Sequence, residues 1–149
     1  MQELTSKTDF ETVLTLSKIK VYRSSANMNK QSYRVGSHVG TKQQALIRAD
    51  YMVNDEGTYY RYYLYELNID LGKIWPMLEP DDGINHDDGY FSEIAEKFDT
   101  VIYKNTGEGD IKNNNLSIVI LNPKNITSSK MVKQLNCNYL SSIQDELYG

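Results

Sequence analysis

The sequence predicts a single α+β domain whose sheet is mainly antiparallel and flanked by helices. Segments with the apolar–polar alternation typical of strands are interspersed with segments whose apolar residues recur every three or four positions. The strand-like segments follow one another at irregular intervals, which differs from the repeated βαβ pattern of a parallel sheet. The length of 149 residues is close to the commonest size of one domain, so we expect residues 1–149 to fold as one unit.

Each element is predicted from its periodicity and its bounding residues. Strands, which are rich in aromatic or β-branched residues, are predicted at residues 19–24, 33–39, 59–69, 99–104 and 116–121. Helices, whose apolar residues share one face, are predicted at residues 8–18, 42–53, 91–98 and 129–147. Thr8 is the expected cap of the first helix and Thr41 that of the second. Residues 70–90 are expected to be mostly loop, with one short apolar turn near Ile74.

The charge balance gives no sign of a large basic surface. The chain has 16 Lys and Arg against 20 Asp and Glu, a net charge of −4 without a dense basic block. Direct nucleic-acid binding is therefore not indicated by charge, although a local basic groove is compatible with this sum. The chain has no apolar run of ~18 residues, and its first residues lack the charged and apolar pattern of a secretory leader, so we expect neither a membrane segment nor a leader. The single Cys137 cannot form an internal disulfide, which favours a cytoplasmic location.

The acidic stretch at residues 81–89 suggests a calcium loop but departs from its pattern. If Glu93 stood at the twelfth position of such a loop, the third position would be Ile84 and the sixth would be Asp87. An oxygen ligand and a glycine are needed there, so we expect a solvated acidic loop, with a nonstandard cation site as the alternative. Two histidines and one cysteine supply too few zinc ligands, and no metal is expected.

Three short motifs follow one another along the chain, each at the end of a predicted strand. They are Val21-Tyr22-Arg23-Ser24, Ser37-His38-Val39-Gly40-Thr41, and Tyr103-Lys104-Asn105 followed by Glu108-Gly109. A fourth segment, Leu121-Asn122-Pro123-Lys124-Asn125-Ile126, ends the strand predicted at residues 116–121. Over about residues 21–128, this ordered set resembles the ADP-ribosyltransferase-like domains of polyvalent proteins from phages and mobile elements.

The resemblance extends to the residues around these motifs. In that family a strand carries an Arg or His, and an His-x-Gly-Thr turn precedes an Ala-rich helix with an Arg, here Ala45 and Arg48. A later strand reads Tyr-Asp-Gly-Ile-Tyr-x-Asn, and residues 98–105 are similar with Thr100 in place of Gly. The resemblance implies a split, mainly antiparallel sheet that clamps NAD in a cleft, in a protein that is a phage or mobile-element effector.

The resemblance also implies roles for individual residues. Glu108 would be the catalytic carboxylate, and four residues would bind NAD: Arg23, His38, Thr41 and Tyr103. These residue types suit the chemistry, because loss of nicotinamide develops a positive charge on the ribose that a carboxylate stabilises. An arginine can clamp a phosphate through paired donors, and histidine and threonine side chains offer hydrogen bonds to a ribose or an amide. One ring of the tyrosine cluster at residues 59–65, otherwise expected in the core, could stack on nicotinamide or adenine.

The implied activity is the transfer of ADP-ribose from NAD to a macromolecular acceptor of the host, a protein or a nucleic acid. Relatives that modify arginine carry an acid or amide two positions before the catalytic Glu, and this sequence has Thr106 there. Arginine is therefore disfavoured as the acceptor, and the acceptor stays open. Two alternatives are a non-catalytic binding or inhibitor module on the same fold and an NAD glycohydrolase. The joint presence of Arg23 and Glu108 favours an enzyme, because a degenerate module need not keep both.

Overall fold

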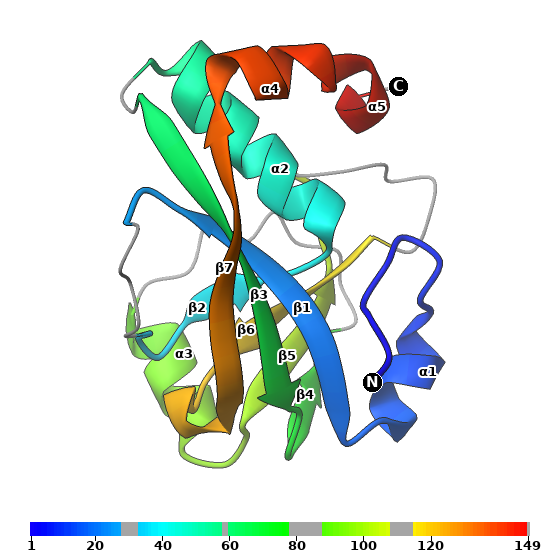
Figure 1. The fold of residues 1–149 in the computed structure, drawn as a ribbon. Coiled ribbons are helices and arrows are strands. Elements are labelled where there is room, and N and C mark those ends of the chain that lie inside the picture. The colour runs from blue at the N-terminus through cyan, green and yellow to red at the C-terminus, as the bar shows by residue number, and fades with distance from the viewer. Residues whose placement is uncertain (28–32, 58–59, 78–87, 108–114, 149) are drawn as a thin grey trace.

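The structure, a computed structural model, describes residues 1–27, 33–57, 60–77, 88–107 and 115–148. These residues form an α+β fold with mainly antiparallel sheets and a few helices (Figure 1). The elements in chain order are α1 (Phe10–Thr15), β1 (Lys18–Ser25), β2 (Ser37–Val39), α2 (Lys42–Asp50), a π-helical turn (Tyr51–Asp55), β3 (Arg61–Asp70), β4 (Ile74–Pro76), α3 (Asp88–Ala95), β5 (Thr100–Lys104), β6 (Leu116–Ile120), a 3₁₀ turn (Pro123–Asn125), β7 (Ile126–Asn136), α4 (Cys137–Ser142) and α5 (Gln144–Tyr148). No helix in the described ranges is long and apolar enough to cross a membrane.

The strands of the described chain are divided between two sheets. A three-stranded antiparallel sheet has the order β1-β3-β7, and a four-stranded sheet has the order β2-β6-β5-β4, in which β4 runs parallel to β5. The sheets are connected where β1 meets the end of β2, through a hydrogen bond from Tyr22 N to Gly40 O (2.8 Å) and one from Gly40 N to Tyr22 O (3.0 Å). The strands predicted at residues 19–24 and 59–69 correspond to β1 and β3 of the first sheet, and those predicted at residues 99–104 and 116–121 correspond to β5 and β6 of the second.

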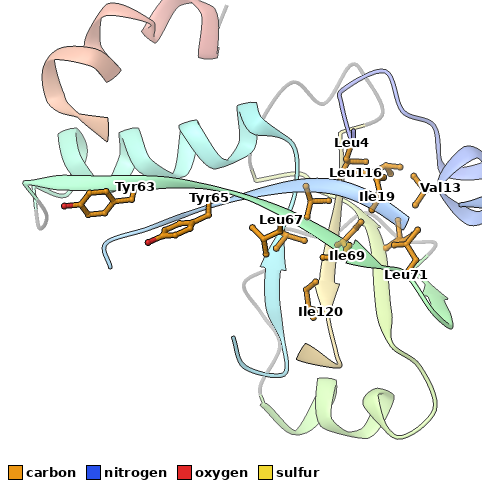
Figure 2. Packing of buried hydrophobic residues seen from close by; sticks show 14 residues of the cluster. Leu4, Val13, Ile19, Tyr63, Tyr65, Leu67, Ile69, Leu71, Leu116 and Ile120 are labelled. Carbon is orange, nitrogen blue, oxygen red and sulfur yellow. The ribbon is translucent and has the colours of Figure 1, made fainter. Parts of the chain in front are cut away.

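The two sheets pack against each other through a shared hydrophobic core. Ile19, Leu67 and Ile69 of the first sheet pack in the same cluster as Leu116 and Ile120 of the second, as Figure 2 shows. These side chains are all buried, and removing such a surface from water contributes roughly 1.5–3 kcal/mol for each large aliphatic side chain. The contact between the sheets therefore fixes β1 relative to β2, the two strands that carry the first two motifs.

The outer faces of the sheets are covered by helices. On the first sheet, α2 and the two C-terminal helices bury Leu64 and Leu135 in a cluster that includes Ala49, Leu140 and Leu147. Figure 2 shows Tyr63 and Tyr65 pointing from β3 to the face opposite α2. On the second sheet, α3 contributes Phe91 to a third cluster, which contains Tyr103 of β5 and Val119 of β6. Helix α2 is thus held along the first sheet.

The helix predicted at residues 129–147 is wrong over its first half. Residues up to Asn136 belong to β7, which pairs with β3, and the helices α4 and α5 begin only at Cys137. In the segment 129–147, the apolar residues spaced by three or four positions include Leu140 and Leu147, which the short helices bury. Val132 matches the same spacing but lies in β7, where its side chain is 41% exposed. Long-range pairing with β3 overrode the local pattern.

Four smaller predictions are also corrected. The first helix is capped by Asp9, whose carboxylate accepts a hydrogen bond from Thr12 N (2.7 Å), because the Thr8 hydroxyl is engaged by Thr5 N (2.9 Å) instead. In the region predicted to be mostly loop, Ile74 begins the strand β4, which pairs with β5. The strand predicted at residues 33–39 is limited to β2, and α2 ends at Asp50, where a π-helical turn continues it.

Candidate functional site

A pocket of about 1100 Å³ lies where β1, β2 and α2 come together. Its wall also includes Tyr103 of β5 and Ser117 of β6, so both sheets contribute to it. The bridge between Tyr22 and Gly40 brings the two sheets together at this position, and both residues line the pocket. The pocket therefore depends on the packing of the two sheets and on the position of α2.

Arg23 lines the pocket from the end of β1. It lies two positions after the fully buried Val21, on the same face of the strand. Its guanidinium Nη1 donates a hydrogen bond to the backbone oxygen of His38 (3.0 Å), and its Cζ lies 5.9 Å from the centre of the Tyr33 ring. Burial holds the pKa of Arg23 below its usual value. Tyr33 and Tyr62 oppose this effect, and the positive charge of Arg48 adds to it. Arginine titrates so far above pH 7 that Arg23 remains a cation in the pocket.

His38 and Tyr103 form a hydrogen-bonded pair across β2 and β5. The His38 Nδ1 lies 2.9 Å from the Tyr103 hydroxyl, and the two rings meet edge to face with their centres 5.9 Å apart. The ring of Phe91 lies edge to face on His38 at 5.8 Å. Because Val39 points into the core, the neighbouring His38 points to the opposite face of β2, which brings its ring to these aromatic residues. The half-buried imidazole is therefore held in one orientation at the pocket wall.

A buried polar network lies at the base of the pocket. Gln44 Oε1 accepts a hydrogen bond from the Ser117 hydroxyl (2.9 Å), and Gln44 Nε2 donates to Asn115 Oδ1 (3.0 Å). Asn115 Nδ2 donates to Asn105 O (2.6 Å), and Asn105 Nδ2 donates to Ser117 Oγ (3.0 Å). A Cβ on Gly40 would lie 1.9 Å from Gln44 Oε1, so any other residue at this position would displace the Gln44 side chain from the network. The network ties the start of α2 to the end of β5 and the start of β6.

Thr41 lies outside the lining of the pocket. Its buried hydroxyl accepts a hydrogen bond from Gln44 N (3.0 Å), and Gln44 Oε1 accepts one from Thr41 N (3.0 Å), which completes a capping box for α2. The structure thus gives Thr41 a structural role, and the sequence-based prediction that it binds NAD finds no support in this geometry.

Glu108 and the acidic stretch 81–87 lie outside the described residues. The nearest described residue before Glu108 is Gly107, which lines the pocket and donates its backbone N–H to Asn105 Oδ1 (2.8 Å). The structure therefore brings Arg23, His38 and Tyr103 together in one pocket, and Glu108 is the next residue after Gly107 in the sequence. The role of Glu108 stays a prediction.

The sequence reasoning assigned no binding role to two further arginines of the pocket. Arg34 precedes β2, in a turn closed by the Ser37 hydroxyl, which donates to Arg34 O (2.8 Å), and Arg48 lies on α2. The described lining residues include three arginines, Arg23, Arg34 and Arg48, and a single acid, Asp55. No described carboxylate lies within ion-pair distance of these three arginines. The spacing of Gln44, Arg48 and Asp55 along one helical face was the signal that could have identified Arg48.

The comparisons with known proteins identify no relative: no protein-family model, curated protein or solved structure matches the chain. The described residues also contain no group of three or more side chains placed to hold a metal ion. The functional interpretation therefore depends on the chemistry of the pocket itself.

Proposed function

We propose that the protein is an NAD-dependent ADP-ribosyltransferase on an ADP-ribosyltransferase-like split sheet. The observation that carries the proposal is the meeting of Arg23, His38 and Tyr103 in one pocket, although they come from three strands of two sheets. These are residues of three motifs that resemble that family, and the pocket adds two more arginines around them. Its volume of about 1100 Å³ is slightly larger than that of most small-molecule sites, which are ~300–1000 Å³, and leaves room for a dinucleotide.

The charges of the pocket suit the diphosphate of NAD. Guanidinium groups bind phosphate oxygens through paired hydrogen bonds, and these bonds are stronger in a partly buried site than in water. Arg23 is the half-buried member of the set, with its position fixed by the bond to His38 O and by the ring of Tyr33. An anionic ligand would satisfy the excess of positive charge, which no described carboxylate balances by an ion pair.

The proposed reaction breaks the bond between the nicotinamide nitrogen and C1′ of the ribose. The bonding electron pair leaves with the nicotinamide, which becomes neutral, and the ribose develops an oxocarbenium character that Glu108 stabilises. A nucleophile of the acceptor then forms a bond to C1′ and loses its proton to solvent. His38, oriented by Tyr103, would hydrogen-bond a ribose hydroxyl or the amide of the nicotinamide.

The first prediction concerns NAD binding. At a concentration ~100 times its dissociation constant, NAD should stabilise the folded protein by about 2.7 kcal/mol, which for a chain of this size raises Tm by about 5–10 °C. Arg23→Gln should abolish most of this increase, because it removes the half-buried cation of the pocket. The matched control is Arg61→Gln, since Arg61 is exposed on β3 outside the pocket and its variant should keep the full increase. Tm measured with and without NAD for each variant compares the two.

The acceptor is tested with NAD labelled on its adenylate half, incubated with the protein and a host lysate. Label that appears on protein or RNA supports a transferase, whereas release of nicotinamide with free ADP-ribose and no labelled macromolecule indicates an NAD glycohydrolase. A protein that shows neither product, and no increase in Tm with NAD, would instead be a binding module, and the proposal would be wrong.

A further inference from the structure

The pocket continues along α2 beyond the residues that the motifs identify. Gln44, Arg48, Tyr51 and Asp55 all line it, and their spacing of three or four residues places them on one face of α2 and of the π-helical turn that follows. With a rise of about 1.5 Å per residue, Arg48 lies roughly 10 Å along the helix from Thr41, and Tyr51 roughly 15 Å. The lining of the pocket thus extends along α2, from His38 just before the start of this helix to Tyr51 just after its end, and we call this stretch the groove.

Arg48 lines the same pocket as Arg23 and adds a second cation to it. Its side chain is exposed, and no described carboxylate lies within ion-pair distance of it. The two guanidinium groups are close enough for the charge of Arg48 to contribute to the lowered pKa of Arg23. Like charges that face one pocket repel each other, and an anion bound between them offsets this repulsion because it attracts both. This part of the groove is therefore suited to a group with several negative oxygens.

Aromatic rings lie next to this cation. Tyr51 is 42% exposed and Tyr148, in the C-terminal helix, is 55% exposed, and both line the groove. The Tyr51 hydroxyl donates to Glu56 Oε1 (2.5 Å), and the Tyr148 hydroxyl donates to Oδ2 of the fully buried Asp50 (2.7 Å). These bonds hold the rings at the groove, where their apolar faces suit a purine base.

Asp55 adds a carboxylate to the part of the groove that Arg48 and Tyr51 line. It is the only acid among the described lining residues. A carboxylate beside a nucleoside accepts hydrogen bonds from the vicinal hydroxyls of its ribose, and it repels a ribose that carries a 2′-phosphate. In a groove that otherwise attracts phosphate, one exposed carboxylate distinguishes a nucleoside with free hydroxyls from its phosphorylated form.

We propose that this end of the groove, formed by Arg48, Tyr51, Tyr148 and Asp55, is an adenosine diphosphate subsite that selects NAD over NADP. Arg48 binds the diphosphate, the two tyrosine rings contact the adenine, and Asp55 accepts the 2′-hydroxyl. The inference rests on the proposed function, because it places the nicotinamide end of the dinucleotide at His38 and Tyr103. In this arrangement α5 also contributes to the site, through Tyr148.

The subsite is tested by calorimetric titration of the 149-residue protein with NAD and with ADP-ribose, which lacks nicotinamide. ADP-ribose should bind to the wild-type protein, and Arg48→Ala should weaken the binding of both ligands about 10- to 100-fold, the usual effect of losing a charge-assisted phosphate contact. Lys42→Ala is the matched control, because Lys42 is an exposed cation of the same helix outside the pocket, and it should leave both affinities unchanged. Equal affinities of the wild-type protein and Arg48→Ala for NAD would overturn the subsite while leaving the proposed function intact. Failure of both ligands to bind to the wild-type protein would overturn the two together.

The selectivity is tested with NADP in the same titration. The wild-type protein should bind NADP about 10-fold more weakly than NAD, because the 2′-phosphate would lie against the carboxylate. Asp55→Asn should remove most of this difference, and Asp145→Asn, which changes an exposed acid of α5 outside the pocket, should not. A preference for NAD that survives unchanged in Asp55→Asn would show that Asp55 does not contact the ribose.

Discussion

Glu108→Gln is expected to lower the rate of nicotinamide release and ADP-ribose transfer about 100- to 1000-fold, the effect of removing one group aimed at transition-state charge. The amide keeps the size of the side chain and can still form hydrogen bonds, but it has no negative charge for the ribosyl cation. NAD affinity should change little, because the ground state carries less of this charge on its ribose. Single-turnover nicotinamide release and NAD titration of the same preparation separate the two effects.

Asp110→Asn is the matched control for loss of charge in the same segment. Asp110 lies two positions after Glu108, so its replacement removes an equal charge from the same stretch of sequence. Activity close to wild type is expected. Full activity of Glu108→Gln together with an inactive Asp110→Asn would mean that the catalytic acid has been assigned to the wrong residue. If neither substitution affects the rate, the chemistry does not depend on this segment.

Asn115→Ala is expected to destabilise the fold by about 2–4 kcal/mol. The buried Asn115 side chain accepts a hydrogen bond from Gln44 Nε2 and donates one to Asn105 O, and each partner left unsatisfied costs roughly 1–3 kcal/mol. In addition, Asn115 has a φ of 47°, a left-handed conformation that asparagine tolerates better than alanine. Urea denaturation of the wild-type protein and the variant measures the difference.

Two further variants separate the causes of this destabilisation. Asn115→Gly removes the hydrogen bonds but accepts the positive φ, so it should be more stable than Asn115→Ala by up to about 1 kcal/mol. Asn138→Ala changes an exposed asparagine of α4 and should stay within about 0.5 kcal/mol of the wild-type protein. If Asn115→Ala were as stable as Asn138→Ala, the polar network at the base of the pocket would not stabilise the fold. Because Asn105 and Asn115 bracket Glu108 in sequence, the destabilised variant should also lose transfer activity at temperatures where it remains folded.

Local patterns were sufficient where a segment's own residues decide its structure. The strand predicted at residues 19–24 corresponds to β1, and the cap at Thr41 is confirmed in full, because a capping box involves only residues three positions apart. The helix predicted at residues 129–147 failed in β7, where pairing with β3 decides the conformation. Arg34 was likewise not identified, since no pattern around it shows that its turn lies beside a pocket.

The sequence by itself determined the α+β class, most of the strands and helices, and the three motifs that contain Arg23, His38 and Tyr103. Only the tertiary structure decided which strands share a sheet, and that these residues meet with Arg48 and Asp55 in one pocket. The physical reason is the range of the interactions involved. Periodicity and caps express contacts between residues a few positions apart, whereas the pocket results from burial of apolar surface between strands distant in sequence.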